Sequence, residues 1–184
     1  MYVILSINLF IFKIKHPLIK SSRKTRFKKG RGMHKEDKSG DVTKRPSFEE
    51  VYMDFAFAIA RRSTCSRLQV GTVITTTDFR KVLAVGYNGN ASGLPNTCDR
   101  TEPGNCGCLH SEENAVINCD SPRNVEKYVF VTHLPCSQCA KRLVNLGNVK
   151  RVYYHTEYRL KDSIEILEGC GIKVIKTEYG KNAL

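Results

Sequence analysis

Apolar positions recur with two different periods along residues 47–178, which indicates a domain built from both helices and strands. Between Phe48 and Ile59 they return every three or four residues, behind a capping-box pattern at Ser47-Phe48-Glu49-Glu50. We therefore expect a helix that begins at this pattern and ends near Arg61.

Short runs of β-branched and aromatic residues, each bounded by turn residues, predict strands between the helices. A loop rich in Gly, Pro and Asn, residues 88–107, separates the first two strands from the rest. The expected elements after the first helix are a hairpin of strands at Val70–Thr76 and Val82–Tyr87, a helix at Ser111–Cys119, a strand at Tyr128–Thr132, a helix at Cys136–Leu146, a strand at Val152–Tyr154, a helix at Leu160–Leu167 and a strand at Ile172–Ile175. This order predicts an α/β fold, a three-layer α/β/α sandwich around a five-stranded mixed sheet with helices on both faces.

Basic residues are concentrated at the N-terminal end. Residues 1–46 contain 13 Lys and Arg against 3 Asp and Glu, whereas residues 47–184 contain 17 against 15. Most of the net charge of +12 therefore lies in a segment with little apolar periodicity, a composition typical of disorder. We divide the chain into a basic, disordered extension at 1–46, a folded domain at 47–178 and a short tail at 179–184. A solvated extension is favoured over a nucleic-acid-binding arm, and Met33 offers an alternative start.

Eight cysteines raise the question of the redox compartment. The apolar run Tyr2–Phe12 has no basic residues before it and no small-residue cleavage site after it, and it is too short to span a bilayer. We therefore expect a cytoplasmic protein without a membrane segment. In that compartment, clustered cysteines indicate metal ligands more often than disulfides.

Two short segments carry the chemistry, His110-Ser111-Glu112 and Pro135-Cys136-Ser137-Gln138-Cys139, and each begins an expected helix. His110, Cys136 and Cys139 would give three ligands to a zinc ion and leave the fourth position for water, as in catalytic zinc sites. Zinc lowers the pKa of its water to about 7. Glu112 can sit beside that water, take its proton and protonate the substrate.

The combination of the two segments matches the His-x-Glu and Pro-Cys-x-x-Cys signature of nucleobase deaminases. A Cys-x-x-Cys pair alone would be weak evidence for a deaminase, because structural zinc sites and redox sites also contain it. The alternative is a structural zinc site in which Glu112 is an ordinary helix carboxylate.

With these residues, the chain resembles the cytidine deaminase superfamily, and within it the dCMP deaminases, from Ser47 to Val174. Further matching segments are Arg62-Ser63-Thr64-Cys65-Ser66-Arg67, Val70-Gly71 and Gly86-Tyr87-Asn88-Gly89. The resemblance implies a cytidine-deaminase-like fold and a hydrolase acting on cyclic amidines, which converts dCMP to dUMP with release of ammonia and so supplies dUMP for thymidylate synthesis. Ser111 is a departure, since the family usually has Ala there, and the two small residues are expected to leave the site unchanged.

The same resemblance implies the substrate contacts. Asn88 would bind the sugar 3′-hydroxyl, and Arg67 would bind the 5′-phosphate, where a bidentate guanidinium suits the dianion. Tyr158 would close over phosphate or sugar, with Arg159 as a second candidate. The alternatives are that Asn88 is a turn residue in left-handed backbone, that Arg67 is a solvated cation and that Tyr158 only packs.

Some dCMP deaminases carry a second zinc ion near the substrate loop, and here four thiols stand in the equivalent region: Cys65, Cys98, Cys106 and Cys108. A four-thiolate site would be closed and structural and would pin the loop. The alternative is that some of these cysteines are buried small hydrophobes. His133, just before the second segment, either lines the pocket or packs.

Family members are commonly homo-oligomers, hexamers or dimers, and many are activated by dCTP with Mg²⁺ and inhibited by dTTP. Two rival functions are a deaminase of another substrate, such as a nucleoside, tRNA or single-stranded nucleic acid, and a catalytically silent zinc-bound regulatory subunit. The nearly neutral domain and the absence of Trp argue against a nucleic-acid substrate. The intact Glu112 argues against a silent subunit.

Overall fold

The computed structural model describes residues 45–100, 105–158 and 161–178. The expected extension, the apolar run Tyr2–Phe12 and the tail at 179–184 lie outside these residues, apart from Arg45 and Pro46.

The expected order of elements is confirmed. It runs α1 (Phe48–Ala60), β1 (Gly71–Thr76), β2 (Val82–Tyr87), α2 (Ser111–Ile117), β3 (Lys127–His133), α3 (Ser137–Leu146), β4 (Val149–Thr156), α4 (Asp162–Gly169) and β5 (Lys173–Lys176). The sheet has the strand order β2-β1-β3-β4-β5. β1 is antiparallel to β2 and β3, whereas β3, β4 and β5 are mutually parallel, so the sheet is mixed as expected.

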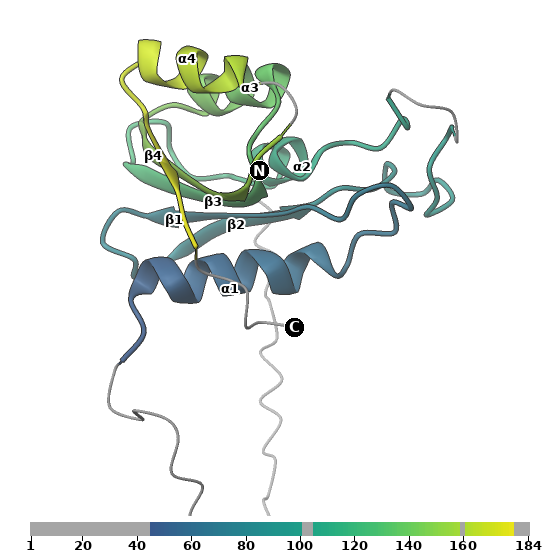
Figure 1. Cartoon of the computed structure of the whole chain (residues 1–184), viewed down its shortest axis with the longest axis horizontal. Helices are drawn as coiled ribbons and strands as arrows, with labels where there is room; N and C mark the ends of the chain where they lie inside the picture. Colours follow the sequence, from purple (N-terminus) through teal and green to yellow (C-terminus); the bar gives the residue numbers. More distant parts are fainter. Residues whose placement is uncertain (1–44, 101–104, 159–160, 179–184) are drawn as a thin grey trace, which may run out of the picture. The chain divides into compact units, whose positions relative to one another are not determined.

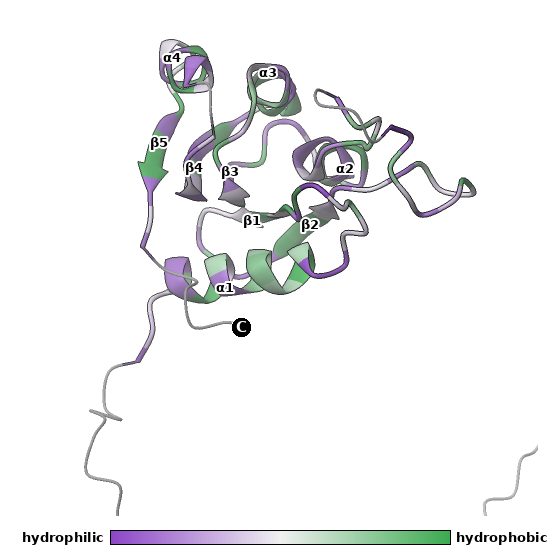
Figure 2. Ribbon diagram, turned by 45° about the vertical axis from the view of Figure 1, so that its right-hand side comes forward, coloured by the Kyte–Doolittle hydropathy of each residue, from purple (hydrophilic) through white to green (hydrophobic). Residues whose placement is uncertain are grey.

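The helices cover both faces of the sheet (Figures 1 and 2). α1 lies on one face, and α2, α3 and α4 lie on the other. Alternate strand residues supply the two cores, because neighbouring side chains of a strand point to opposite faces. In β3, for example, Val129 and Val131 belong to the core beneath α2–α4, and Phe130 belongs to the core beside α1. This burial on both faces fixes the positions of the helix ends that carry the site.

Two glycines let helices approach the hairpin closely. A Cβ atom at Gly71 would meet the carbonyl oxygen of Ala56 at 2.1 Å, and one at Gly86 would meet that of Ser111 at 2.2 Å. α1 thus packs its small residues Ala56 and Ala60 against β1, and the bulkier Phe48 stays 52% exposed. α2, which carries Glu112, packs directly on β2 at Gly86.

The capping box expected at the first helix is present, with Ser47 Oγ accepting from the Glu50 N–H at 3.2 Å. Several boundaries differ from expectation by one or two residues, and the largest difference is in β4, which spans Val149–Thr156 rather than Val152–Tyr154. The extra residues of β4 include the charged Lys150 and Arg151, so its apolar signal is shorter than its hydrogen-bonded length. In the described part of the chain, no helix is long and apolar enough to cross a bilayer.

Candidate metal and catalytic site

The two sequence segments meet at the N-termini of neighbouring helices. His110 is the N-cap residue of α2, and Cys136 is the N-cap residue of α3, with Cys139 in the first turn. Neither N-cap side chain makes a capping hydrogen bond at the start of its helix. The positive ends of both helix dipoles favour anionic groups here.

The three candidate metal ligands converge on one point. Nδ1 of His110 lies 3.5 Å from Sγ of Cys136 and 3.4 Å from Sγ of Cys139, and all three ligand atoms lie within 4.8 Å of one another. A tetrahedral zinc ion with Zn–S of about 2.3 Å and Zn–N of about 2.0 Å separates nitrogen from sulfur by roughly 3.5 Å. The donor set and its spacing therefore fit zinc, with one coordination position left over.

The thiols and the imidazole perturb one another strongly. Hydrogen bonds from Cys139 and His110 lower the pKa of Cys136 to about 3, the Cys139 bond being the larger cause. The pKa of His110 is raised, chiefly by its bond to Cys136. The pKa of Cys139 is raised by sharing a proton with Cys136 and by burial. A thiolate is the form that binds a metal, so these hydrogen bonds favour the metal-binding form of Cys136.

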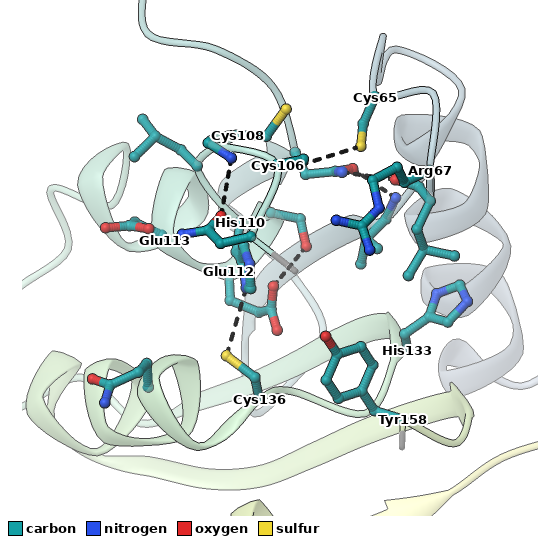
Figure 3. Close-up of a pocket in the computed structure, with 18 of the residues that line it drawn as sticks. Cys65, Arg67, Cys106, Cys108, His110, Glu112, Glu113, His133, Cys136 and Tyr158 are labelled. Atoms are coloured by element: carbon teal, nitrogen blue, oxygen red, sulfur yellow. Dashed lines mark hydrogen bonds between the residues drawn. The ribbon is translucent and has the colours of Figure 1, made fainter. Parts of the chain in front are cut away.

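Glu112 lies beside this ligand set in the first turn of α2 and is only 4% exposed. Burial raises the pKa of its carboxyl group above the usual range. One carboxylate oxygen, Oε2, accepts a hydrogen bond from Ser111 Oγ at 2.9 Å. Figure 3 shows the carboxyl group inside the pocket, close to His110 and Cys136.

A cavity of about 720 Å³ opens in front of these residues (Figure 3). The Arg67 guanidinium and the Tyr158 hydroxyl are directed into it from opposite walls, and His133 lies at the same end. His133 also bonds through Nδ1 to Thr132 Oγ1 at 3.1 Å. The expected substrate residues Arg67, Asn88 and Tyr158 thus line the same cavity as Glu112. Arg159 lies outside the described residues.

Asn88 lines the cavity, but its side chain also holds the chain that leads to β1. Its Oδ1 accepts from the Val70 N–H at 2.8 Å, and its Nδ2 donates to the Leu68 carbonyl at 2.7 Å. The alternative of a left-handed backbone at Asn88 is wrong, since positive φ among the described non-Gly residues occurs only at Phe79 and Asn148. Asn88 therefore fixes the segment that follows Arg67.

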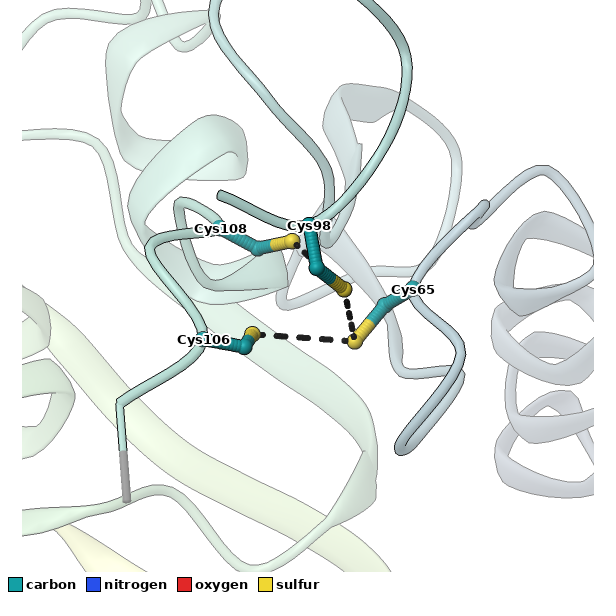
Figure 4. A group of neighbouring side chains, drawn as sticks. All are labelled: Cys65, Cys98, Cys106 and Cys108. Atoms are coloured by element: carbon teal, nitrogen blue, oxygen red, sulfur yellow. Dashed lines mark hydrogen bonds between the residues drawn. The ribbon is translucent and has the colours of Figure 1, made fainter. Parts of the chain in front are cut away.

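The four cysteines expected at a second zinc site form a cluster, from the segment after α1, the loop after β2 and the segment before α2: Cys65, Cys98, Cys106 and Cys108 (Figure 4). Sγ of Cys65 lies 3.8 Å from that of Cys106 and 3.6 Å from that of Cys98, which lies 3.7 Å from that of Cys108. Four thiolates around one zinc ion at about 2.3 Å would lie roughly 3.8 Å apart. The four sulfur atoms lie within 4.8 Å of one another, so this cluster fits a closed metal site.

Backbone pairing joins the cysteine cluster to the catalytic helix. Leu109, the single residue between Cys108 and His110, exchanges two hydrogen bonds with Gly89, of 2.9 and 3.1 Å. On the other side, the carbonyl of Cys106 accepts from the N–H of Asp99 at 3.0 Å, which closes the loop before it. These bonds fix the segment that leads into His110.

Two features of the site had no sequence signal strong enough to find them. Arg142 of α3 and Glu113 of α2 form an ion pair of 3.1 Å at the cavity wall. Ser111 and Thr72 of β1 bond to each other at 2.8 Å behind Glu112. Ser111 is adjacent to Glu112 in sequence, but only the fold shows that its hydroxyl turns toward the carboxylate.

Comparison with known proteins agrees with this geometry. Residues 46–156 match the description "Cytidine and deoxycytidylate deaminase zinc-binding region". The chain is 31% identical over 144 residues to a deoxycytidylate deaminase of Schizosaccharomyces pombe, a match that spans 71% of this chain and 44% of that protein. It is 32% identical over 128 residues to a deoxycytidylate deaminase of Mycobacterium phage D29, spanning 61% of this chain and 98% of the phage protein.

Among solved structures, the fold is similar to that of dCMP deaminase from the cyanophage S-TIM5 in complex with dCMP and dUMP. The TM-score is 0.64 at 34% sequence identity, and the match covers 73% of this chain and 99% of the phage chain. The chain thus spans less than half of the fission yeast relative and nearly all of the two phage relatives.

Proposed function

Because this chain belongs to the cytidine and deoxycytidylate deaminase family, we propose that it hydrolyses dCMP to dUMP and ammonia with zinc as its cofactor. The observation that carries the proposal is the convergence of His110, Cys136 and Cys139 beside the buried carboxyl group of Glu112. Zinc held by these three ligands would supply Lewis acidity and a nucleophile at neutral pH.

Glu112 moves the protons of the reaction. Water adds at C4 of the cytosine ring and the bond from C4 to the exocyclic nitrogen breaks, so both protons of the water leave its oxygen, one for the ring nitrogen and one for the departing amine. The carboxylate oxygen that Ser111 does not hold, Oε1, accepts the proton from water and delivers it to the ring nitrogen. The buried position of Glu112 excludes bulk water from these transfers.

Arg67 and Tyr158 line the part of the cavity that binds the phosphate and sugar of the nucleotide. Arg67 pairs with the 5′-phosphate, and the Tyr158 hydroxyl closes over phosphate or sugar from the opposite wall. The amide nitrogen of Asn88 has two N–H groups, and one of them donates to Leu68, so the second can donate to the sugar 3′-hydroxyl. These assignments favour a mononucleotide over a nucleoside.

The cluster of Cys65, Cys98, Cys106 and Cys108 holds a second, structural zinc ion in this proposal. Its support is the sulfur spacing of 3.6–3.8 Å and the origin of the four thiols in three separate chain segments. Metal bound there would order the loop that ends at the catalytic helix.

The family resemblance further predicts a homo-oligomer and regulation by dCTP with Mg²⁺ and by dTTP, and the sequence itself predicts a cytoplasmic location. These stay predictions, to be checked by light scattering and by the rate of dCMP deamination with each nucleotide.

Substrate profiling tests the proposal most directly. Ammonia release is measured from dCMP, deoxycytidine, cytidine, dCTP and a single-stranded RNA oligonucleotide under one condition. We expect dCMP to have the highest kcat/KM. A preference for the oligonucleotide would instead indicate a polynucleotide deaminase, and no ammonia from any substrate by the zinc-loaded protein would indicate a silent subunit.

A further inference from the structure

Three buried oxygen atoms are joined by consecutive hydrogen bonds that end at Glu112. Oγ1 of Thr72 lies 2.8 Å from Oγ of Ser111, which lies 2.9 Å from Oε2 of Glu112. Thr72 and Ser111 are both 0% exposed, and Glu112 is 4% exposed. These hydrogen bonds connect the central region of the sheet, in β1, with the first turn of α2.

The donor in each of these two hydrogen bonds follows from the protons that the hydroxyl groups carry. A serine hydroxyl has one proton, and Ser111 donates it to the Glu112 carboxylate. The Thr72 hydroxyl must then donate to Ser111 Oγ, since the serine has no second proton to give. Hydrogen bonds arranged in this head-to-tail order polarise one another and strengthen the last bond, which ends on the carboxylate.

The bond from Ser111 restricts the rotation of the carboxyl group. With Oε2 held, only Oε1 is available to reacting atoms in the cavity. A glutamate side chain has three rotatable bonds, and a proton-transferring group must lie within about 2.6–3.2 Å of its target. Fixing Oε2 therefore also fixes the direction in which Oε1 faces the reacting atoms.

We propose that Ser111, supported by Thr72, is a positioning residue that holds the Glu112 carboxyl group in its proton-transferring orientation. This inference rests on the proposed role of Glu112 in deamination. Ser111 lines the cavity, but its hydroxyl is bonded to Glu112 and Thr72, so in this proposal it acts through Glu112, and Thr72 acts through Ser111.

The test compares four variants with the wild-type protein. Ser111→Ala removes the bond to Glu112, Thr72→Val removes the donor to Ser111 at nearly constant volume, and Thr72→Ser keeps that donor. Thr75→Val is the matched control, because Thr75 is a fully buried threonine of the same strand whose hydroxyl has no hydrogen-bond partner among the described residues. For each protein, kcat and KM for dCMP, zinc per chain and Tm are measured.

We expect Ser111→Ala to lower kcat by roughly tenfold to a hundredfold, the effect of losing one hydrogen bond to a charged group, with KM and zinc content unchanged. Thr72→Val should lower kcat by a smaller factor, Thr72→Ser should retain more of the rate than Thr72→Val, and Thr75→Val should leave kcat unchanged. A folded Ser111→Ala protein with kcat within about twofold of wild type would overturn the proposal. So would a fall in kcat that merely follows lost zinc or an equal fall in the Thr75→Val control.

A structural measurement separates this inference from the proposed function. Crystal structures of the zinc-loaded wild-type and Ser111→Ala proteins should show one orientation of the Glu112 carboxyl group in the former and more than one in the latter. A single, unchanged orientation in both would refute the positioning role, whichever substrate the protein deaminates. If Ser111→Ala does not fold, the same comparison between Thr72→Val and Thr72→Ser decides the question.

Discussion

Gly86 of β2 and Ser111 of α2 are in such close contact that a methyl group on Gly86 would lie 2.2 Å from the Ser111 carbonyl oxygen. A backbone carbonyl in a helix cannot move aside alone, so a side chain at Gly86 must displace the whole first turn of α2. That turn carries Glu112 and follows His110 directly.

Gly86→Ala should therefore lower the free energy of unfolding by about 1–3 kcal/mol or more and reduce zinc bound at the catalytic site. Thermal unfolding and zinc content per chain check this. Gly169→Ala is the control, because a Cβ atom there meets no atom within 4 Å, and it should leave both quantities unchanged. A Gly86→Ala protein with full zinc content and wild-type Tm would show that α2 can move without loss of stability or of bound zinc.

Glu112→Gln should leave the fold and zinc content intact and lower kcat by about 10²–10⁴-fold, because the amide cannot accept the proton from water. Ser111 can still donate to the amide oxygen, so the side chain keeps its hydrogen bond. Single-turnover rates with dCMP measure the effect. Retention of more than a tenth of the wild-type rate would mean that another group carries the proton.

Arg67→Ala should raise KM for dCMP and lower kcat/KM by roughly 10–150-fold, the cost of about 1.5–3 kcal/mol for a lost charge-assisted contact. Deoxycytidine, which lacks the phosphate, provides the internal control, and its kcat/KM should be unaffected. Arg67→Lys keeps the charge but not the bidentate geometry, so its kcat/KM for dCMP should lie between those of the wild-type protein and Arg67→Ala. Equal losses on both substrates would place Arg67 outside the phosphate site.

Asn88 combines two roles that can be separated. Asn88→Asp keeps the acceptor for the Val70 N–H but loses the donor to Leu68, so it should lower the free energy of unfolding by about 1–2 kcal/mol. If Asn88 also donates to the 3′-hydroxyl, the variant should lose kcat/KM on dCMP and lose little on the 2′,3′-dideoxy analogue. The same loss on both nucleotides would leave Asn88 with its structural role alone.

Elemental analysis should find two zinc ions per chain. Cys106→Ser/Cys108→Ser should reduce the count to one and lower Tm, because the loop before α2 loses its crosslink. The double variant Cys136→Ser/Cys139→Ser should also bind one zinc ion, at the remaining cluster, and should be inactive. A ratio near one in the wild-type protein would assign the four loop cysteines to packing.

The sequence predicts the order of all nine elements because their apolar periods are clear and Gly, Pro or Asn residues separate most of them. It also predicts His110, Cys136 and Cys139 as one ligand set, since their two motifs have a fixed spacing relative to helix starts. The length of β4 was underestimated, because Lys150 and His155 interrupt its apolar pattern while the backbone bonds to β3 continue.

The rest of the site depends on side-chain directions that one sequence does not contain. Asn88 could be assigned to the pocket, but its bonds to Leu68 and Val70 depend on how the segment before β1 passes the end of β2. Ser111 was expected to leave the site unchanged, yet its hydroxyl bonds to Glu112, because β1 places Thr72 directly behind it.

The short connection through Leu109 limits how this chain can vary in evolution. One residue separates Cys108 from His110, and it is paired on both backbone groups with Gly89, so an inserted or deleted residue here would move a ligand of each cluster at once. The loop that Asp99 and Cys106 close is different, because their hydrogen bond joins its two ends whatever lies between them. Natural length variation should therefore occur between Arg100 and Asn105 and be absent from Cys106 to Glu112, so that this loop is the place where insertions can accumulate without moving the proposed zinc ligands.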